Sequence, residues 1–204
     1  MITNIVFDMG GVLIRWDTAT MLRQVDLSAE DAEIMNRELF RTVEWVQQDR
    51  GIVTEEALRS AVLARLPQRL HPAAETLIGW YHQFIFPVPG MAELVRELKG
   101  NGYHIYLLSN ANLALREYFG KIPGSECFEK LMVSAEEKLL KPAHEIYERL
   151  YEKFGLNPGE CFFIDDMPAN VEGALRTGMR GAVFHGDVAR LRRELNAAGI
   201  RCEQ

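Results

Sequence analysis

Five short apolar runs, separated by helical patterns, are the feature that most constrains how this sequence can fold. Each run is rich in β-branched or aromatic residues and stops at a polar residue or a glycine, as buried strands do. The runs are Ile2–Phe7, Tyr103–Leu108, Lys130–Val133, Cys161–Ile164 and Gly181–Phe184. Helical periodicity follows at 91–99, 111–119, 143–154, 169–177 and 188–198. This alternation predicts an α/β fold, a doubly wound parallel sheet with helices on both faces.

The stretch between the first two apolar runs has a different pattern. Roughly seventy residues show helical periodicity and little strand signal, which is far too long for a loop. Thr54 marks the start of one helix, because its hydroxyl can cap backbone N–H groups and two acidic residues follow it. A Pro-Val-Pro-Gly segment at 87–90 then turns the chain. We therefore expect a catalytic core of residues 1–16 and 87–204 and an inserted helical cap of residues 17–86.

Composition and charge exclude several classes of protein. Hydrophobic residues make up 48% of the 204 residues and charged ones 25%, which is ordinary globular usage. A formal charge of −6 without a basic run argues against a nucleic-acid partner. Three separated cysteines, Cys127, Cys161 and Cys202, suggest neither a disulfide framework nor a thiolate metal site. The sequence shows neither a signal-peptide pattern nor an apolar run of membrane-spanning length, so we expect a cytoplasmic protein without a membrane partner.

Polar side chains stand where three of the predicted strands end. Asp8 follows the first run, Ser109 and Asn110 follow the second, and Asp165 and Asp166 follow the fourth. In open parallel sheets, ligands bind beyond the carboxyl ends of the strands. Carboxylates and hydrogen-bond donors gathered there are the groups that phosphoryl transfer with Mg²⁺ requires.

Taken singly, most of these residues have ordinary structural explanations. An Asp before glycines is usually a turn residue, Ser-Asn after a strand is often a helix cap, and Lys141-Pro is usually a solvated loop. Adjacent carboxylates after a strand as apolar as Cys-Phe-Phe-Ile are different, because they repel each other. A bound cation explains Asp165 and Asp166 better than chance does.

The order of these elements resembles the haloacid dehalogenase superfamily, and specifically its phosphatases with a helical cap inserted after the first strand. The resembling stretches are 6–13, 107–110, 141–142 with 145–147 behind it, and 163–166 with Asn170 and Gly173 behind it. They span nearly the whole chain. The pattern is most similar to a subgroup that includes a bacterial phosphatase of glucose 1-phosphate.

The resemblance implies a role for each residue around the phosphoryl group. Asp8 would attack phosphorus and form an aspartyl-phosphate. Ser109 and the backbone amide of Asn110 would hold the phosphoryl oxygens as substrate-binding groups. Lys141 would act both in catalysis and in substrate binding, by neutralising the developing charge.

The resemblance also implies a Mg²⁺ cofactor and no organic one. Its ligands would be Asp8, the carbonyl of Gly10, and one or both of Asp165 and Asp166. Many phosphatases of the superfamily carry a second Asp at the position of Gly10, which serves as general acid and base. Its replacement by glycine leaves the proton donor unassigned, and Asp17 is a candidate that is equally well explained as a helix cap.

The function predicted from these residues is hydrolysis of a small phosphorylated metabolite, a sugar phosphate in the first instance. Two other enzymes of the superfamily compete with it, a metal-free 2-haloacid dehalogenase and a phosphomutase. A non-catalytic binding module is the alternative from another class, and Gly10 is the feature that favours it. Trp16, Trp45 and Trp80 could line a substrate pocket, but aromatic residues at helical spacing are more often core.

Overall fold

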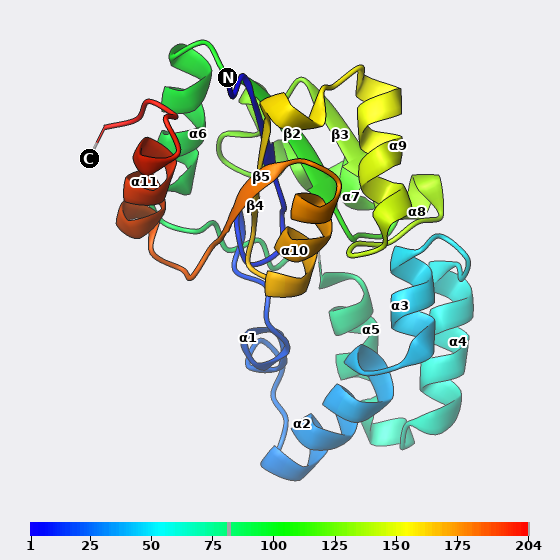
Figure 1. Ribbon diagram of the computed structural model, residues 1–204. Coiled ribbons are helices and arrows are strands. Elements are labelled where there is room, and N and C mark those ends of the chain that lie inside the picture. Colours follow the sequence, from blue (N-terminus) through cyan, green and yellow to red (C-terminus); the bar gives the residue numbers. More distant parts are fainter. Residues whose placement is uncertain (81–82, 204) are drawn as a thin grey trace.

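The computed structural model describes residues 1–80 and 83–203. Residues 81–82 of the predicted cap and residue 204 of the predicted core lie outside this description. One sheet with strand order β3-β2-β1-β4-β5 forms the centre of the protein, and all its strands are parallel (Figure 1). The strands are β1 (Asn4–Phe7), β2 (His104–Ser109), β3 (Lys130–Val133), β4 (Cys161–Asp165) and β5 (Arg180–Val183). The predicted doubly wound fold is confirmed.

Helices cover both faces of this sheet because successive strand side chains point to opposite sides. Ile5 and Phe7 pack into one hydrophobic cluster with the leucines of two helices, and Val6 packs into a second cluster on the other face. The first face carries α6 (Met91–Gly100) and α11 (Val188–Ala197), and the second carries α9 (His144–Phe154) and α10 (Pro168–Arg176). Figure 1 shows these two layers on either side of the sheet.

The segment after β2 differs from its prediction. A helix was expected over 111–119, but α7 covers only Leu115–Tyr118, followed by a short 3₁₀ turn at Phe119–Lys121. The backbone N–H of Ala111 donates instead to the Ser134 hydroxyl at 2.9 Å, a bond to a different element. The Ala111 carbonyl accepts from the N–H of Ala135 at 3.3 Å, and the N–H of Leu115 donates to Asn112 instead of to Ala111. The first helical turn is therefore replaced by bonds to another element, and sequence periodicity carries no sign of them. The remaining short elements of this half are α8 (Ser134–Glu137) and 3₁₀ turns at Ser125–Cys127 and Pro158–Glu160.

The described residues between 17 and 86 are helical and contain no strand. Their helices are α1 (Thr18–Leu22), α2 (Ala29–Met35) with a π-helical continuation (Asn36–Phe40), α3 (Val43–Asp49), α4 (Glu55–Arg65), a 3₁₀ turn (Gln68–Leu70) and α5 (His71–Ile78). Thr54 caps α4 as predicted, since its hydroxyl accepts a hydrogen bond from the N–H of Ala57 at 3.1 Å. Ser28 and Thr42 cap α2 and α3 in the same way.

The two connections between this helical body and the sheet run side by side. The N–H of Arg15 donates to the carbonyl of Phe86 at 2.7 Å, and the N–H of Val88 donates to that of Leu13 at 2.9 Å. Both connections therefore lie just beyond the carboxyl end of β1, and the helical body occupies the lower half of Figure 1. No helix within the described ranges is both long and apolar enough to cross a membrane.

Candidate active site

The strand order brings Asp8 beside Asp165. β1 lies between β2 and β4, with Phe7 paired to Ile164, and the N–H of Asp8 donates to the carbonyl of Ile164 at 2.9 Å. The chain runs outward from β1 to β3 and then returns to β4, so the connections diverge between β1 and β4. Such a switch point is where open α/β sheets bind ligands.

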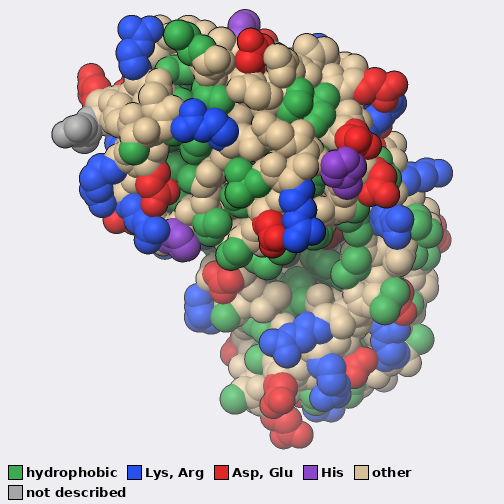
Figure 2. Space-filling model, in the orientation of Figure 1, with side chains coloured by type: hydrophobic (Ala, Val, Ile, Leu, Met, Phe, Trp, Pro, Cys, Tyr) green, Lys and Arg blue, Asp and Glu red, His purple; other side chains and the backbone are tan. Residues whose placement is uncertain are grey.

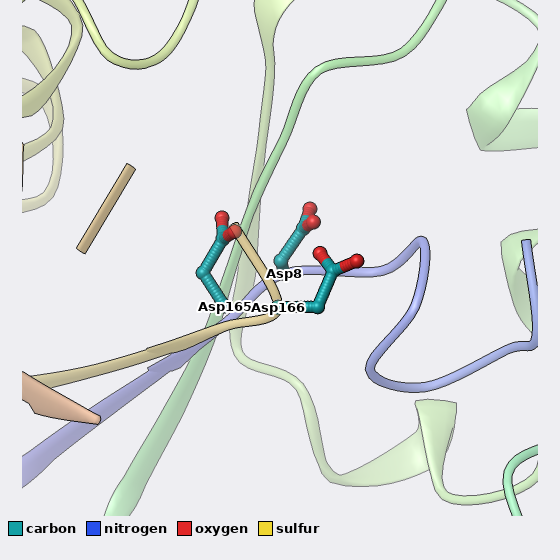
Figure 3. A group of neighbouring side chains, drawn as sticks. All are labelled: Asp8, Asp165 and Asp166. Atoms are coloured by element: carbon teal, nitrogen blue, oxygen red, sulfur yellow. The ribbon is translucent and has the colours of Figure 1, made fainter. Parts of the chain in front are cut away.

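Three carboxylates, those of Asp8, Asp165 and Asp166, gather at this point. Each offers an oxygen, and these oxygens lie within 4.8 Å of one another. Figure 3 shows the three carboxylates turned to the same side of the strand ends. Gly11 permits the close approach, because its φ is +74° and a Cβ there would lie 2.3 Å from an oxygen of Asp166.

The cluster is electrostatically costly without a cation. Burial, opposed by Lys141 and aided by the charge of Asp165, raises the pKa of Asp8 to about 7. Burial and the charge of Asp165 also raise the pKa of Asp166. Hard carboxylate oxygens converging on one point are the donor set of Mg²⁺, so these residues fit the metal that the sequence predicts.

Lys141 is buried between two of the carboxylates. Its Nζ lies 2.8 Å from Oδ1 of Asp8 and 2.6 Å from Oδ2 of Asp165, and it donates to the carbonyl of Leu108 at 3.0 Å. Burial alone would lower the pKa of Lys141, but the two carboxylates outweigh it and the pKa is raised. The ammonium is therefore held charged beside Asp8.

Asp165 and Asp166 have different surroundings. Oδ1 of Asp165 accepts from the N–H of Met167 at 2.8 Å, Nδ2 of Asn170 lies 3.0 Å from both oxygens, and Lys141 binds Oδ2. Asp165 is thus occupied with protein donors, whereas Asp166 lines a cavity between the sheet and the helical body. Asn170 was not predicted as a site residue, although its place five residues after Asp165 was a usable signal.

Ser109 and Asn110 are placed less directly than expected. Ser109 ends β2, is 1% exposed, and is not among the residues that line the cavity. The Asn110 side chain pairs with the backbone of Lys141, donating to its carbonyl at 3.0 Å and accepting from its N–H at 2.9 Å. The side chain therefore positions Lys141, and the predicted contact between the Asn110 backbone amide and a phosphoryl group stays a prediction.

A cavity of about 320 Å³ opens above the carboxylates, between the sheet and the helical body. Its lining comprises Asp8, Met9, Gly10, Trp16, Trp45, Asp49, Trp80, Asn110, Ala111, Asn112, Tyr118, Lys141, Asp166, Met167 and Asn170. Figure 2 shows the molecule hollowed at this junction, with hydrophobic side chains inside the hollow.

Aromatic rings form one wall of this cavity. The ring centroids of Trp16 and Trp80 lie 4.4 Å apart, those of Trp16 and Trp45 lie 6.1 Å apart and stacked, and those of Trp80 and Tyr118 lie 5.3 Å apart. Both roles considered for the three tryptophans apply, because each packs against other rings and also lines the cavity. Their spacing could not show this, because they meet only in the folded chain.

Asp17 and Asp49 are two acids of the helical body that bear on the identity of the proton donor, and their surroundings differ. Asp17 caps α1: its carboxylate accepts from the N–H and the hydroxyl of Thr20, both at 2.7 Å, and the hydroxyl bond is the main cause of its lowered pKa. Asp17 does not line the cavity, so the capping role is the one the structure supports. Asp49, which sequence reasoning did not single out, lines the cavity from the end of α3, and burial raises its pKa to about 7.

A doubly wound sheet with a carboxylate and lysine cluster at its switch point defines an α/β enzyme that uses a buried acid. Residues 2–178 match the description haloacid dehalogenase-like hydrolase. The match covers well over half of the chain, so the protein belongs to this family and is a hydrolase.

Similar proteins include phosphatases. A sesquiterpene phosphatase of Aspergillus oryzae is 28% identical over 187 residues, which are 86% of each chain. A D-ribitol-5-phosphate phosphatase of Bacteroides thetaiotaomicron is 28% identical over 180 residues, covering 84% of this chain and 86% of that one. A crystal structure of a family enzyme from the same bacterium, complexed with magnesium and inorganic phosphate, has a TM-score of 0.70 at 25% identity and covers 94% of this chain and 99% of its own.

Proposed function

We propose that the protein is a Mg²⁺-dependent phosphatase that hydrolyses a small phosphomonoester through an aspartyl-phosphate on Asp8. One observation carries the proposal: Asp8 lines a cavity with the ammonium of Lys141 2.8 Å from its carboxylate and the carboxylate of Asp166 in the same cluster. A nucleophile, a fixed cation and metal ligands then meet at one point. The phosphatase relatives at 28% identity support the same reaction.

Mg²⁺ would be held by Asp8, Asp166 and the carbonyl of Gly10. Asp165 is the weaker candidate, because protein donors already bind both of its oxygens. When bound, the metal supplies positive charge that orients the phosphoryl oxygens and offsets their developing charge. The similar crystal structure that contains magnesium and phosphate supports this cofactor.

The chain's own residues would then divide the reaction between them. Asp8 attacks phosphorus, and Lys141 stabilises negative charge on the phosphoryl group. Asp165 and Asn110 hold Lys141 in position. We propose that the helices of 17–86 act as the cap. They confine the site to a cavity of about 320 Å³, which fits a metabolite and excludes a folded phosphoprotein.

A sugar phosphate remains the proposed substrate. Trp16 and Trp45 line the cavity and offer apolar surface to the C–H face of a sugar ring, while Asn112 offers a polar group to its hydroxyls. The same aromatic wall favours a second candidate, a phosphomonoester whose organic part is itself apolar or flat. The sesquiterpene phosphatase among the relatives makes that candidate worth testing.

The reaction is tested with 4-nitrophenyl phosphate and purified protein, with Mg²⁺ and with excess EDTA. We expect turnover that requires Mg²⁺ and falls more than about 10³-fold in Asp8→Asn. Asp187→Asn is the matched control, since Asp187 caps α11 outside the cavity and Asn caps as well as Asp. Chloride release from 2-chloropropionate without metal would show that the protein is a dehalogenase. Absence of turnover of 4-nitrophenyl phosphate with Mg²⁺ would favour the non-catalytic binding module.

The substrate class is tested with a panel of glucose 1-phosphate, ribitol 5-phosphate, flavin mononucleotide and a prenyl phosphate. The sugar-phosphate proposal expects the highest kcat/KM for one of the first two compounds. A preference of more than about tenfold for the prenyl or flavin compound, which corresponds to 1.4 kcal/mol, would favour the second candidate instead. Phosphate transferred to a second sugar, with none released, would indicate the phosphomutase.

A further inference from the structure

The proposed reaction needs a proton donor for the leaving alcohol, and position 10 cannot provide one. Gly10 has no side chain, and a Cβ placed there would lie 3.4 Å from Cβ and 3.5 Å from Cδ1 of Trp16. The indole of Trp16 therefore borders the space into which a longer side chain at position 10 would extend. A donor has to come from another element that reaches the cavity, and the inference below rests on the proposed phosphatase function.

Asp49 is an acid of the helical body that reaches this cavity. It ends α3 and lines the same cavity as Asp8 and Lys141. Its backbone is fixed to the other half of the protein, because the hydroxyl of Ser134 donates to the Asp49 carbonyl at 2.5 Å. That hydroxyl also accepts from the N–H of Ala111 at 2.9 Å, immediately after the β2 end of the site.

The two residues after Asp49 are docked on the same part of the sheet domain. Nε of Arg50 donates to the carbonyl of Lys138 at 3.2 Å. Gly51 has a φ of +72°, and a Cβ there would lie 2.0 Å from the carbonyl oxygen of Ala135, so only glycine fits. Three consecutive residues are thus held against α8 and the turn after it, which keeps Asp49 at a fixed place on the cavity wall.

The surroundings of Asp49 favour a carboxyl group that gains and loses a proton. Burial raises its pKa to about 7, and within residues 1–80 and 83–203 no cation forms an ion pair with it. Asp8, Lys141 and Asp166 line the same cavity, and Glu136, Glu137 and Lys138 lie on and after α8, against which this segment is docked, but burial alone accounts for the raised pKa of Asp49. The two glutamates are paired elsewhere, Glu136 with Arg116 and Glu137 with Arg149 and Lys153.

We propose that Asp49 is the general acid and base of this enzyme, supplied by the helical body in place of an acid at position 10. In the first step an oxygen of the Asp8 carboxylate bonds to phosphorus, the P–O bond to the alcohol breaks, and its electron pair takes the proton of the Asp49 carboxyl group. In the second step the Asp49 carboxylate accepts a proton from water as the water oxygen bonds to phosphorus. The Asp8–phosphorus bond breaks and returns its electron pair to Asp8, so both carboxyl groups are regenerated.

The proposal is tested with Asp49→Asn and two substrates of nearly equal shape, phenyl phosphate and 4-nitrophenyl phosphate. Phenolate is the poorer leaving group and needs the proton more. We expect kcat/KM for phenyl phosphate to fall by about 10² and that for 4-nitrophenyl phosphate to fall by less than about tenfold. kcat/KM reports only the steps up to formation of the phosphoenzyme, so the comparison isolates proton donation to the leaving alcohol.

Glu44→Gln is the matched control, a carboxylate-to-amide change in α3 at a residue that pairs with Arg65 at 2.7 Å outside the cavity. The control should leave the ratio of the two kcat/KM values unchanged. The wild-type kcat/KM for phenyl phosphate should also decline as pH rises through about 7, where the acid loses its proton, and Asp49→Asn should lose that decline.

Equal losses on both substrates in Asp49→Asn, or an unchanged alkaline limb, would overturn the assignment of Asp49 while Asp8→Asn still showed the phosphatase. Full activity in Asp8→Asn would instead overturn the proposed function. If Asp49→Asn does not fold, the wild type still decides: a general acid makes kcat/KM depend weakly on the leaving group across substituted phenyl phosphates. A steep dependence in the wild type would contradict the proposal.

Discussion

At the scale of single residues, neighbouring acids in one turn have separate surroundings. Asp165 is fully buried and bound by protein donors, while Asp166 lines the cavity. A carboxylate whose oxygens are already occupied has less to offer a metal. The adjacent pair is therefore best understood as one residue that positions Lys141 and one that faces the proposed Mg²⁺ site.

Asp166→Asn tests the second of these roles. The amide keeps the size of the side chain but removes a charge from the metal site, so the Mg²⁺ concentration for half-maximal activity should rise by more than about tenfold. Activity at saturating Mg²⁺ should recover at least in part. The measurement is a Mg²⁺ titration of 4-nitrophenyl phosphate turnover, and an unchanged half-maximal concentration would contradict the assignment.

Asp165→Asn should give the opposite pattern. Lys141 would lose one of two carboxylates that hold its buried ammonium, at 2.6 Å. Breaking a buried ion pair typically costs about 3–5 kcal/mol, so the free energy of unfolding in urea should fall markedly. kcat should fall as well, with little change in the half-maximal Mg²⁺ concentration. A variant as stable as the wild type would show that Asp165 does not hold the lysine.

At the scale of elements, the contact between α3 and α8 joins the helical body to the site. Gly51→Ala tests it, because a Cβ would meet the Ala135 carbonyl at 2.0 Å and the residue has a φ of +72°. We expect unfolding free energy to fall by more than about 1 kcal/mol and the effect of Asp49 on phenyl phosphate to weaken.

Gly186→Ala is the control that distinguishes the contact between Gly51 and Ala135 from the strain of a positive φ. Gly186 has a φ of +79°, but nothing lies within 4 Å of a Cβ there. Its substitution should carry the strain alone and leave the ratio of phenyl to 4-nitrophenyl phosphate activity unchanged. Equal effects of the two substitutions on stability and on this ratio would show that the docking of α3 on α8 does not position the site.

The elements also show where sequence reasoning succeeds. The five strands were predicted within one or two residues because apolar runs and the residues that stop them are local features. The helix expected over 111–119 was mostly wrong because the N–H of Ala135, a residue far along the chain, donates to the carbonyl of Ala111. Asp49 was missed for the same kind of reason, since its place on the cavity depends on where an insertion folds back.

At the scale of the whole molecule, the carboxylate cluster links stability to pH and to metal. Burial raises the pKa of Asp8 to about 7 from a usual 3.8, so between these values the folded protein binds more protons than the unfolded chain. Without metal, stability should therefore fall as pH rises from about 4 to about 7 and then level off. Asp49, with its pKa also raised to about 7 by burial, adds to the same trend.

Mg²⁺ should reverse the part of this loss that comes from the cluster. The metal binds the deprotonated carboxylates and competes with protons, so the increase in Tm on adding Mg²⁺ should be small at pH 5.5 and larger at pH 8. A concentration of 100 times Kd adds about 2.7 kcal/mol, or roughly 5–10 °C for a chain of this size. Asp49 is not a proposed ligand, so its contribution to the pH dependence cancels in the difference between Tm with and without Mg²⁺. Asp8→Asn should lose most of the Mg²⁺ shift, because a neutral amide replaces a charged ligand. A Mg²⁺ shift of equal size at both pH values, or one that persists in Asp8→Asn, would place the metal away from this cluster.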